Sequence, residues 1–465
     1  MPPARIHTRP LARPLARTRA AALPAALALR IGGVLIALAL LLAALPARAE
    51  IQIQEVKSQG GITAWLVEDH TIPFAALQLS FRGGASLDAA DKAGATSLMA
   101  ALLEEGAGDL DARAFARAQE SLAASFGYSV GDDSVSISAK FLTENRDAAL
   151  ELLRKTLIEP RFDDDAIERV RAQMLSNIRS DLKDPNAIAG QAFSKLAFGD
   201  HPYANPQDGT EATVGALTRD DLLAAKQAAL VLGRVSIGVV GDITPEELAP
   251  LLDALLGDLP QDGPPLPPRA AVQLTGGTTV IDFATPQSVA LFGHEGLALD
   301  DEDFFAAYLL NTILGGGSFE SRLMTEVREK RGLTYGVYSY LVGKEEADIW
   351  MGQVASANDR IGEAISVIRA QWAHIAEEGV TQEELDNAKT YLTGSYPLRF
   401  DGNGPIARII TGMQENGFPI DYAATRNEKV EAVTLEDVNR VARERLRAQD
   451  LRFVVVGQPE GLEAN

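Results

Sequence analysis

The sequence predicts an α+β protein made of two homologous halves, each an antiparallel sheet with helices packed on one face. Three observations support this fold class. Each half combines short β-type runs with amphipathic helical segments. One helix–strand unit occurs twice at a fixed spacing, and a proline-rich segment lies between the two copies.

The repeated unit lies near the end of each half. Residues 216–222 lead through a helical segment to the strand-like run 235–242, and residues 432–438 lead in the same way to 451–458. The step from Leu217 to Val433 equals the step from Gly241 to Gly457, which is 216 residues. A constant offset over a whole helix–strand unit indicates duplication of a half-chain.

Strands come first in the N-terminal half. Apolar and β-branched runs predict strands at 51–55, 63–67 and 75–81. Residues 128–142 predict a hairpin with Gly131, Asp132 and Asp133 as its turn. Amphipathic spacing predicts helices at 93–103, 112–124 and 163–182, and in the second half at 361–377, 381–392, 405–413 and 435–446.

The chain is too long for one ordinary domain. Residues 259–268 hold five of its prolines and predict a semi-rigid linker. We therefore divide the chain into an export signal at 1–49, an N-terminal α+β half at 50–258, a linker at 259–272 and a C-terminal α+β half at 273–465.

Residues 1–49 have the pattern of an export signal. Six arginines precede an apolar run at 31–45, which ends in the small-x-small sequence Pro46-Ala-Arg-Ala49. The run is short for a membrane span, which needs about 20 apolar residues. Residues 20–29 are also apolar, so an uncleaved anchor stays an alternative. The pattern predicts a periplasmic protein that meets the membrane only through such an uncleaved signal.

Charge and cysteine content exclude several classes of function. The leader holds seven arginines and no acid, so its removal changes the net charge from −21 to −28 (−21 − 7). So acidic a protein repels nucleic acid and anionic membrane surfaces. The sequence has no cysteine, which excludes disulfides, thiolate metal sites and a cysteine nucleophile.

Residues 314–339 form the most informative stretch. Gly315, Gly316 and Gly317 permit close approach of backbone or ligand. A short helix is predicted to follow, with Ser318 as its N-cap and Gly332 at its end. Residues 334–340 then predict a strand.

Arg328 and Tyr335 are the candidate functional pair in this stretch. The turn at Gly332 allows both side chains to point to one place, and Tyr335 is predicted on the same strand face as Val337 and Ser339. A guanidinium and a phenol together can donate hydrogen bonds to a peptide carbonyl or a developing oxyanion. The structural alternative is a solvated helix arginine and a core tyrosine.

The stretch resembles a known motif. Gly-Gly-Gly-Ser-x-x-Ser-Arg-Leu followed by Val-Arg-Glu-Lys-Arg-Gly-Leu-Thr-Tyr is similar to the C-terminal half-motif of the pitrilysin/insulysin family of inverted zinc metallopeptidases. The resemblance covers nearly all of 51–460 and implies two hinged halves that form one valve of a clamshell. It also implies that Arg328 and Tyr335 hold substrate and stabilise the transition state, and that Gly315, Gly316 and Gly317 border the substrate cleft.

The zinc motif of that family is missing. The family places His-x-x-Glu-His on the helix at 93–103, where the two histidines bind zinc and the glutamate activates water. The frame around the motif matches, but the slots hold Ser97, Ala100 and Ala101. Asn177 stands where the third ligand, a glutamate, is expected, and asparagine is a poor zinc ligand. The sequence therefore predicts no metal in this chain.

The histidines do not rebuild a metal site. After the leader they are His70, His201, His294 and His374, and none lies within four residues of another. We expect them to be structural or solvated. The acidic pairs 104–105 and 132–133 are expected to be a helix end and a hairpin turn.

Within the resembled family, some members are two-chain enzymes in which one chain holds zinc and its partner supplies the Arg/Tyr pair. This sequence has the second pattern. We therefore expect a non-catalytic, substrate-binding subunit of an exported heterodimeric zinc endopeptidase. Its partners would be peptide substrates and a catalytic subunit with an intact His-x-x-Glu-His, and the zinc would lie in that subunit.

Two alternatives stay open. The first is a peptide-binding or scaffold protein without peptidase activity, comparable to the core subunits of respiratory complexes. The second is an independent hydrolase that uses residues with no recognised motif. The presence of Arg328 and Tyr335 favours the peptidase subunit, because a scaffold needs no oxyanion donors.

Overall fold

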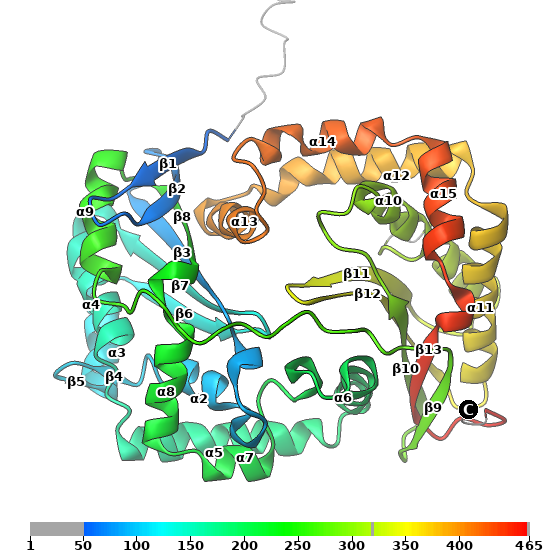
Figure 1. Cartoon of the computed structure of the whole chain (residues 1–465), viewed down its shortest axis with the longest axis horizontal. Coiled ribbons are helices and arrows are strands. Elements are labelled where there is room, and N and C mark those ends of the chain that lie inside the picture. Colours follow the sequence, from blue (N-terminus) through cyan, green and yellow to red (C-terminus); the bar gives the residue numbers. More distant parts are fainter. Residues whose placement is uncertain (1–50, 318–319, 463–465) are drawn as a thin grey trace, which may run out of the picture. The chain divides into compact units, whose positions relative to one another are not determined.

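A computed structural model describes residues 51–317 and 320–462 of the chain (Figure 1). Residues 51–465 form one compact unit. The predicted export signal at 1–49 and the predicted N-cap Ser318 lie outside the described residues. None of the described helices combines the length and apolar content that a membrane crossing requires.

The first half contains a six-stranded sheet in the order β1-β2-β8-β3-β7-β6. Its strands are β1 (Gln54–Lys57), β2 (Thr63–Glu68), β3 (Phe74–Arg82), β6 (Ser125–Val130), β7 (Ser134–Leu142) and β8 (Val235–Gly241). Only β2 and β8 run parallel among these neighbours. The predicted hairpin turn at 131–133 is confirmed, since β6 and β7 flank it.

The second half contains a five-stranded sheet in the order β11-β12-β10-β13-β9. Its strands are β9 (Gly277–Asp282), β10 (Gln287–Glu295), β11 (Val337–Lys344), β12 (Ala347–Ala357) and β13 (Arg452–Gly457). Read from β9, this order repeats β2-β8-β3-β7-β6 strand for strand. The parallel pair recurs at β13 and β9. The predicted α+β class with antiparallel sheets is confirmed, with one parallel pair in each sheet.

The 216-residue repeat has a structural counterpart. Helices α8 (Arg219–Ala229) and α15 (Leu435–Arg445) both begin with a capping box, in which the threonine hydroxyl and an aspartate satisfy each other's backbone N–H groups. The threonines are Thr218 and Thr434, exactly one repeat apart. Helix α8 leads to β8, which pairs with β2 and β3. Helix α15 leads to β13, which holds the equivalent place between β9 and β10.

The remaining helices follow the same plan in both halves. In the first half they are α2 (Ala95–Ala101), α3 (Ala112–Ser121), α4 (Arg146–Ile158), α5 (Asp164–Asp181), α6 (Pro185–Phe198), α7 (Glu211–Ala216) and α9 (Pro245–Leu256). In the second half they are α10 (Phe304–Leu314), the π-helix Met324–Glu329, α11 (Ile361–Glu378), α12 (Gln382–Ser395), α13 (Asn403–Glu415) and α14 (Tyr422–Ala432).

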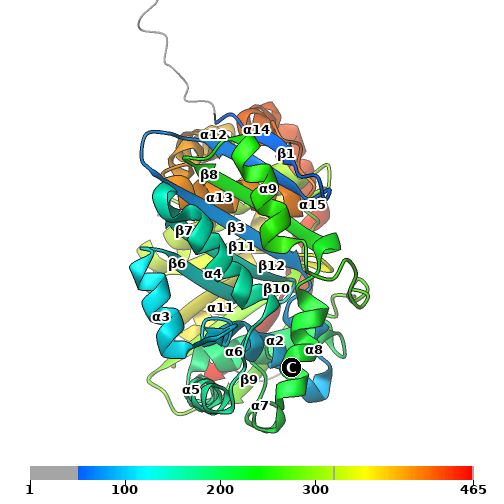
Figure 2. The same ribbon diagram turned by 90° about the vertical axis from the view of Figure 1, so that its left-hand side faces the viewer.

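Each sheet packs one face against helices of its own half, as predicted. In the first half, Leu77 and Leu79 of β3 share a buried core with Leu150 and Leu153 of α4. Figure 2 shows α4 and α9 lying in front of β3 and β7. In the second half, Phe292 of β10 belongs to the core that buries α10, α11 and α15.

The opposite face of each sheet carries a helix from the other half. Helix α6 of the first half packs on β10 and β13, with Phe193 in a buried cluster with Val454. Helix α13 of the second half packs on β3 and β8, with Ile410 buried against Val240. Figure 1 shows α13 beside β8 and α6 near β10. The sequence patterns did not predict that these two helices pack on the sheet of the opposite half.

The predicted linker runs between α9 and β9 and is held at several points. His201 Nε2 lies 2.9 Å from the carbonyl oxygen of Pro268, and the Ala270 N–H donates to the Glu346 carbonyl at 2.7 Å. Arg269 forms an ion pair with Asp348. The segment therefore connects the two sheets along a fixed path, while the exact domain limits stay a prediction.

Candidate substrate-binding site

The glycine-rich segment follows α10 and touches strand β11. The Ser339 N–H donates to the Gly315 carbonyl at 2.9 Å. A Cβ on Gly315 would lie 2.8 Å from the Ser339 nitrogen, and a Cβ on Gly316 would lie 2.6 Å from the Thr312 Cα. These two glycines are thus required for close packing. Gly317 has a φ of +89° and open space around it, so a role of the three glycines at a substrate cleft stays a prediction.

A buried asparagine fixes β11 against α10. Asn311 Oδ1 accepts hydrogen bonds from the Ser339 hydroxyl at 2.8 Å and from Trp350 Nε1 at 2.9 Å, and its Nδ2 donates to the Ser339 carbonyl at 3.2 Å. Sequence reasoning missed Asn311. The signal was available, because it is the most polar residue in the otherwise apolar helix 304–314.

Arg328 lies on a π-helix, Met324–Glu329, where an ordinary short helix was predicted. π-Helices are rare and occur frequently at functional sites. The wide turn ends at Gly332, as predicted, where φ is +59°. The Gly332 N–H donates to the Arg328 carbonyl at 2.8 Å, and the Leu333 N–H to the Val327 carbonyl at 3.0 Å.

Tyr335 lies in the turn before β11, so its predicted place within the strand, on the face that carries Val337 and Ser339, is wrong. Its exposed fraction is 89%, whereas Val337 and Ser339 are buried. The strand starts only at Val337, because the Thr334 hydroxyl accepts from the Gly336 N–H at 3.1 Å and contacts the Ala355 carbonyl at 2.7 Å. This local hydrogen bonding replaces the strand ladder at Tyr335.

Arg328 and Tyr335 therefore belong to one compact turn, the segment 328–336. Arg328 is half-buried at its start, and the phenol of Tyr335 projects into solvent near its end. A tyrosine this exposed, between two hydrogen-bonded neighbours, presents a hydroxyl that is able to donate or accept a hydrogen bond. Whether the pair binds substrate stays a prediction.

Strand β11 forms one edge of its sheet, and β6 forms the equivalent edge of the first sheet. The tips of these two edge hairpins meet. Lys344 forms an ion pair with Asp132, and the Glu345 N–H donates to Asp133 at 3.1 Å. The acidic pair at 132–133 is therefore a structural contact between the halves.

The frame of the missing zinc motif is intact in α2. Asp88 accepts hydrogen bonds from the N–H groups of Gly94 and Thr96 and from the Thr96 hydroxyl at 2.6–3.2 Å, and so caps the start of this helix. Burial nevertheless raises the pKa of Asp88. Helix α2 packs beside α5. The two helices that carry the zinc-ligand positions of the family therefore lie together in this chain.

The slots in that frame hold side chains without metal-binding character. The Ser97 hydroxyl donates to the Gln207 carbonyl at 3.2 Å, and Ala100 is buried. Asn177 Oδ1 accepts from Gln173 Nε2 at 3.0 Å. Within 51–317 and 320–462, no three His, Cys, Asp or Glu side chains gather closely enough to hold a metal ion.

The histidines lie apart. His70 contacts Asp242 at 2.7 Å and Glu68 at 3.2 Å on the surface, and these carboxylates, Asp242 first, raise the pKa of His70. His294 is buried, His201 contacts the linker and His374 is exposed.

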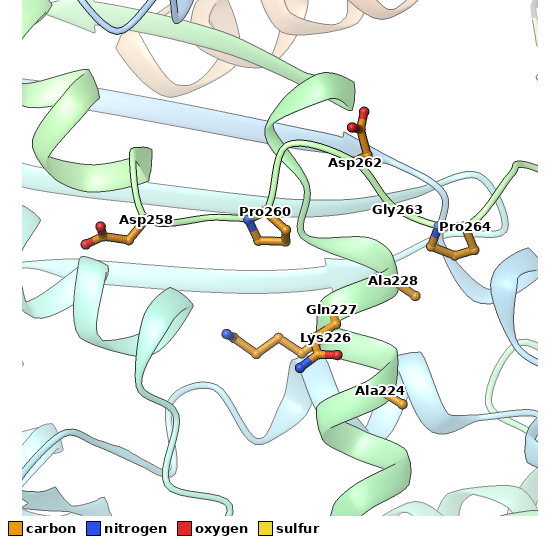
Figure 3. Close-up of a pocket in the computed structure, with 9 residues that line it drawn as sticks. All are labelled: Ala224, Lys226, Gln227, Ala228, Asp258, Pro260, Asp262, Gly263 and Pro264. Atoms are coloured by element: carbon orange, nitrogen blue, oxygen red, sulfur yellow. The ribbon is translucent and has the colours of Figure 1, made fainter.

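A surface cavity of about 650 Å³ lies between α8 and the segment 258–264 (Figure 3). None of the predicted site residues lines it. Lys226 extends beneath this segment and donates to the Ile158 carbonyl at 3.3 Å, and burial lowers its pKa. This lysine therefore caps the end of α4.

Two family profiles match the chain in sequence. Residues 63–211 match "Insulinase (Peptidase family M16)" and residues 216–392 match "Peptidase M16 inactive domain". The boundary between the matches falls before α8, close to the start of the repeated unit.

Relatives and solved structures agree with these matches. The chain is 27% identical over 404 residues to a Helicobacter pylori protein named "Non-peptidase homolog YmxG", covering 87% of this chain and 93% of the relative. It is 29% identical over 317 residues to an uncharacterized zinc protease of Streptomyces coelicolor, covering 66% of this chain and 68% of that protein.

The crystal structure of a peptidase M16 inactive domain from Pseudomonas fluorescens superposes with a TM-score of 0.83 at 28% identity, covering 89% of this chain and all of that one. A chain of complex III2 from Candida albicans shares the fold, with a TM-score of 0.74 at 16% identity over 89% of this chain and 98% of that chain. These matches show that the chain belongs to the M16 peptidase family, the pitrilysin/insulysin group. It is a homologue in which the frame of the zinc motif is kept but the His-x-x-Glu-His residues are replaced.

Proposed function

We propose that this protein is the non-catalytic, substrate-binding subunit of an exported heterodimeric zinc endopeptidase. One observation carries the proposal. The four positions that would hold zinc and activate water are Ser97, Ala100, Ala101 and Asn177, while the turn that bears Arg328 and Tyr335 is complete. A chain with that combination has lost the chemistry and kept the substrate contacts.

The proposed partner is an M16 chain with an intact zinc motif. Its zinc would polarise the scissile carbonyl and supply the water nucleophile. The part of the present chain is to donate hydrogen bonds: the Arg328 guanidinium and the Tyr335 hydroxyl hold the peptide backbone and stabilise the oxyanion. Strands β11 and β6 are edge strands, to which an extended peptide can add as a further strand. On β11 such pairing leaves out Ser339, whose N–H and carbonyl are already bonded to Gly315 and Asn311.

The test is reconstitution. The purified chain alone is expected to contain no stoichiometric zinc and to leave a quenched fluorescent peptide library uncleaved. Mixing it with an M16 chain from the same genome that carries His-x-x-Glu-His is expected to produce chelator-sensitive cleavage. Stoichiometric zinc with cleavage by the isolated chain would overturn the proposal, and no cleavage in the mixture would favour a peptide-binding or scaffold protein.

Two substitutions test the assigned pair in the reconstituted complex. Arg328→Met and Tyr335→Phe are each expected to lower kcat about 100- to 1000-fold, the usual effect of removing one oxyanion donor. Tyr391→Phe is the matched control, because Tyr391 is also exposed but lies on α12, outside the turn and β11. Full turnover by both variants, measured beside this control, would show that the pair has no catalytic part.

A further inference from the structure

Arg360 occupies an unusual position for an arginine. It is the N-cap residue of α11, and its side chain makes no capping hydrogen bond to that helix. Ser, Thr, Asp and Asn are preferred there because they accept hydrogen bonds from the free N–H groups, which a guanidinium does not. A positive charge at a helix N-terminus also opposes the helix dipole. The residue is therefore poor for the helix it begins.

The Arg360 side chain instead crosses to the turn that carries Arg328 and Tyr335. Its Nη1 donates to the Gly332 carbonyl at 2.9 Å and its Nη2 donates to the Arg331 carbonyl at 2.8 Å. Both carbonyls lie at the end of the π-helix, where backbone acceptors have no partner within the helix. A planar guanidinium can bridge two such carbonyls with fixed geometry.

We call these two hydrogen bonds of Arg360 the clamp. Neighbouring hydrogen bonds attach the next two residues of the turn as well. The Ser356 hydroxyl donates to the Leu333 carbonyl, and Thr334 contacts the Ala355 carbonyl. Residues 331–334 are thus each attached to the corner between β12 and α11. That corner is rigid, because Ile361 is fully buried at the first turn of α11.

The first half contains a weaker version of the same device. Asn145 is the N-cap of α4, the counterpart of α11, and likewise makes no capping bond to its own helix. Its Nδ2 donates to the carbonyl of Leu122, the C-cap residue of α3, at 3.0 Å. One hydrogen bond there corresponds to two at Arg360. The half with the stronger clamp is the half whose turn carries the exposed Tyr335.

We infer that Arg360 is a positioning residue, which fixes the turn 328–336 so that Arg328 and Tyr335 are presented to peptide in one arrangement. The inference rests on the proposed function. Arg360 acts through the backbone of Arg331 and Gly332, to whose carbonyls its guanidinium donates.

The first test needs no activity. In Arg360→Met, hydrogen–deuterium exchange of the amides of Gly332, Leu333 and Gly336 is expected to rise at least about tenfold, since these amides are hydrogen-bonded within the turn. Arg360→Lys is expected to restore protection only partly, because an ammonium lacks the two-donor fork. Circular dichroism checks that both variants fold. Unchanged exchange in folded Arg360→Met would overturn the inference.

The second test uses the reconstituted complex. Arg360→Met is expected to lower kcat at least about tenfold with a smaller change in KM, and to add little to the loss in Arg328→Met. Asn145→Ala, which removes the equivalent bond in the first half, is the matched control and is expected to keep wild-type turnover. Loosened exchange with unchanged kcat would also overturn the inference. Failure of the wild-type mixture to cleave would count against the proposed function alone, since the exchange test decides the clamp independently.

Discussion

His294 is a buried histidine that stays neutral because of its neighbours. Its Nε2 accepts a hydrogen bond from Trp372 Nε1 at 3.0 Å, and its Nδ1 lies 2.6 Å from the Glu295 carbonyl, to which it donates. The ring packs against Trp350 and Trp372. Both nitrogens are thus used by the neutral ring, and burial lowers the pKa of His294 to about 4.

This residue predicts a pH dependence of stability. An unfolded histidine has a pKa near 6.5, so between pH 6.5 and 4 the unfolded chain binds a proton that the folded chain does not. The free energy of unfolding should therefore decrease as the pH is lowered from 6.5 to 4. The expected loss is about 1.4 kcal/mol per pH unit and about 3 kcal/mol in all. Urea unfolding at several pH values measures it.

The contribution of His294 is isolated by comparison with His294→Gln, which does not titrate. The difference in slope between wild type and this variant should appear below pH 6.5. His374→Gln changes an exposed histidine and should keep the wild-type slope. Equal slopes in all three proteins would contradict the assignment.

At the scale of single elements, the duplicated helix–strand unit offers paired measurements. The Thr218 N–H donates to Asp221 at 2.8 Å and the Thr434 N–H to Asp437 at 2.9 Å, so the two capping boxes have the same geometry. An N-cap threonine is worth about 1 kcal/mol relative to alanine.

Thr218→Ala and Thr434→Ala are each expected to lower the free energy of unfolding by about 1 kcal/mol, as measured by urea denaturation. Thr390→Ala is the control. Its hydroxyl bonds only to the Asp386 carbonyl within an exposed part of α12, so its loss should cost close to nothing. A loss at one cap and none at the other would mean that the two copies no longer share one structural role.

Element limits also show where local patterns were enough. The repeat, the hairpin turn at 131–133 and the helix end at Gly332 follow from residue preferences that act within a few positions. The strand start at Val337 did not follow, because the side-chain pattern that predicted a strand extends back to Thr334. The contact of Thr334 with the Ala355 carbonyl, twenty-one residues away, makes the strand begin later.

At the scale of the whole described unit, α6 and α13 each pack on the sheet of the other half, and we therefore expect the two sheets to unfold together. Gly238 on β8 permits the packing of α13 at one point. A Cβ there would lie 2.5 Å from the Ala407 carbonyl and 2.4 Å from the Thr411 hydroxyl, both on α13. The corresponding position on β13, one repeat later, is Val454.

Gly238→Ala is expected to destabilise the protein by about 1–3 kcal/mol through overpacking against α13. Gly412→Ala, on α13 itself with open space around it, should be neutral or slightly stabilising.

Hydrogen exchange followed in both halves during urea unfolding is expected to show one shared transition. Separate transitions for the two sheets would contradict the role given to α6 and α13.

Residue patterns alone were sufficient for the α+β class and the duplication, because periodicity and turn preferences can be read from the sequence. The loss of the zinc ligands followed from the resemblance to the zinc peptidase motif. The residue patterns also picked out Arg328 and Tyr335. The packing of α6 and α13 on the opposite sheets, the outward presentation of Tyr335 and the clamp of Arg360 were decided by tertiary structure. Each depends on contacts between residues far apart in the chain, and an amphipathic helix or an arginine in sequence does not specify which distant surface it will meet.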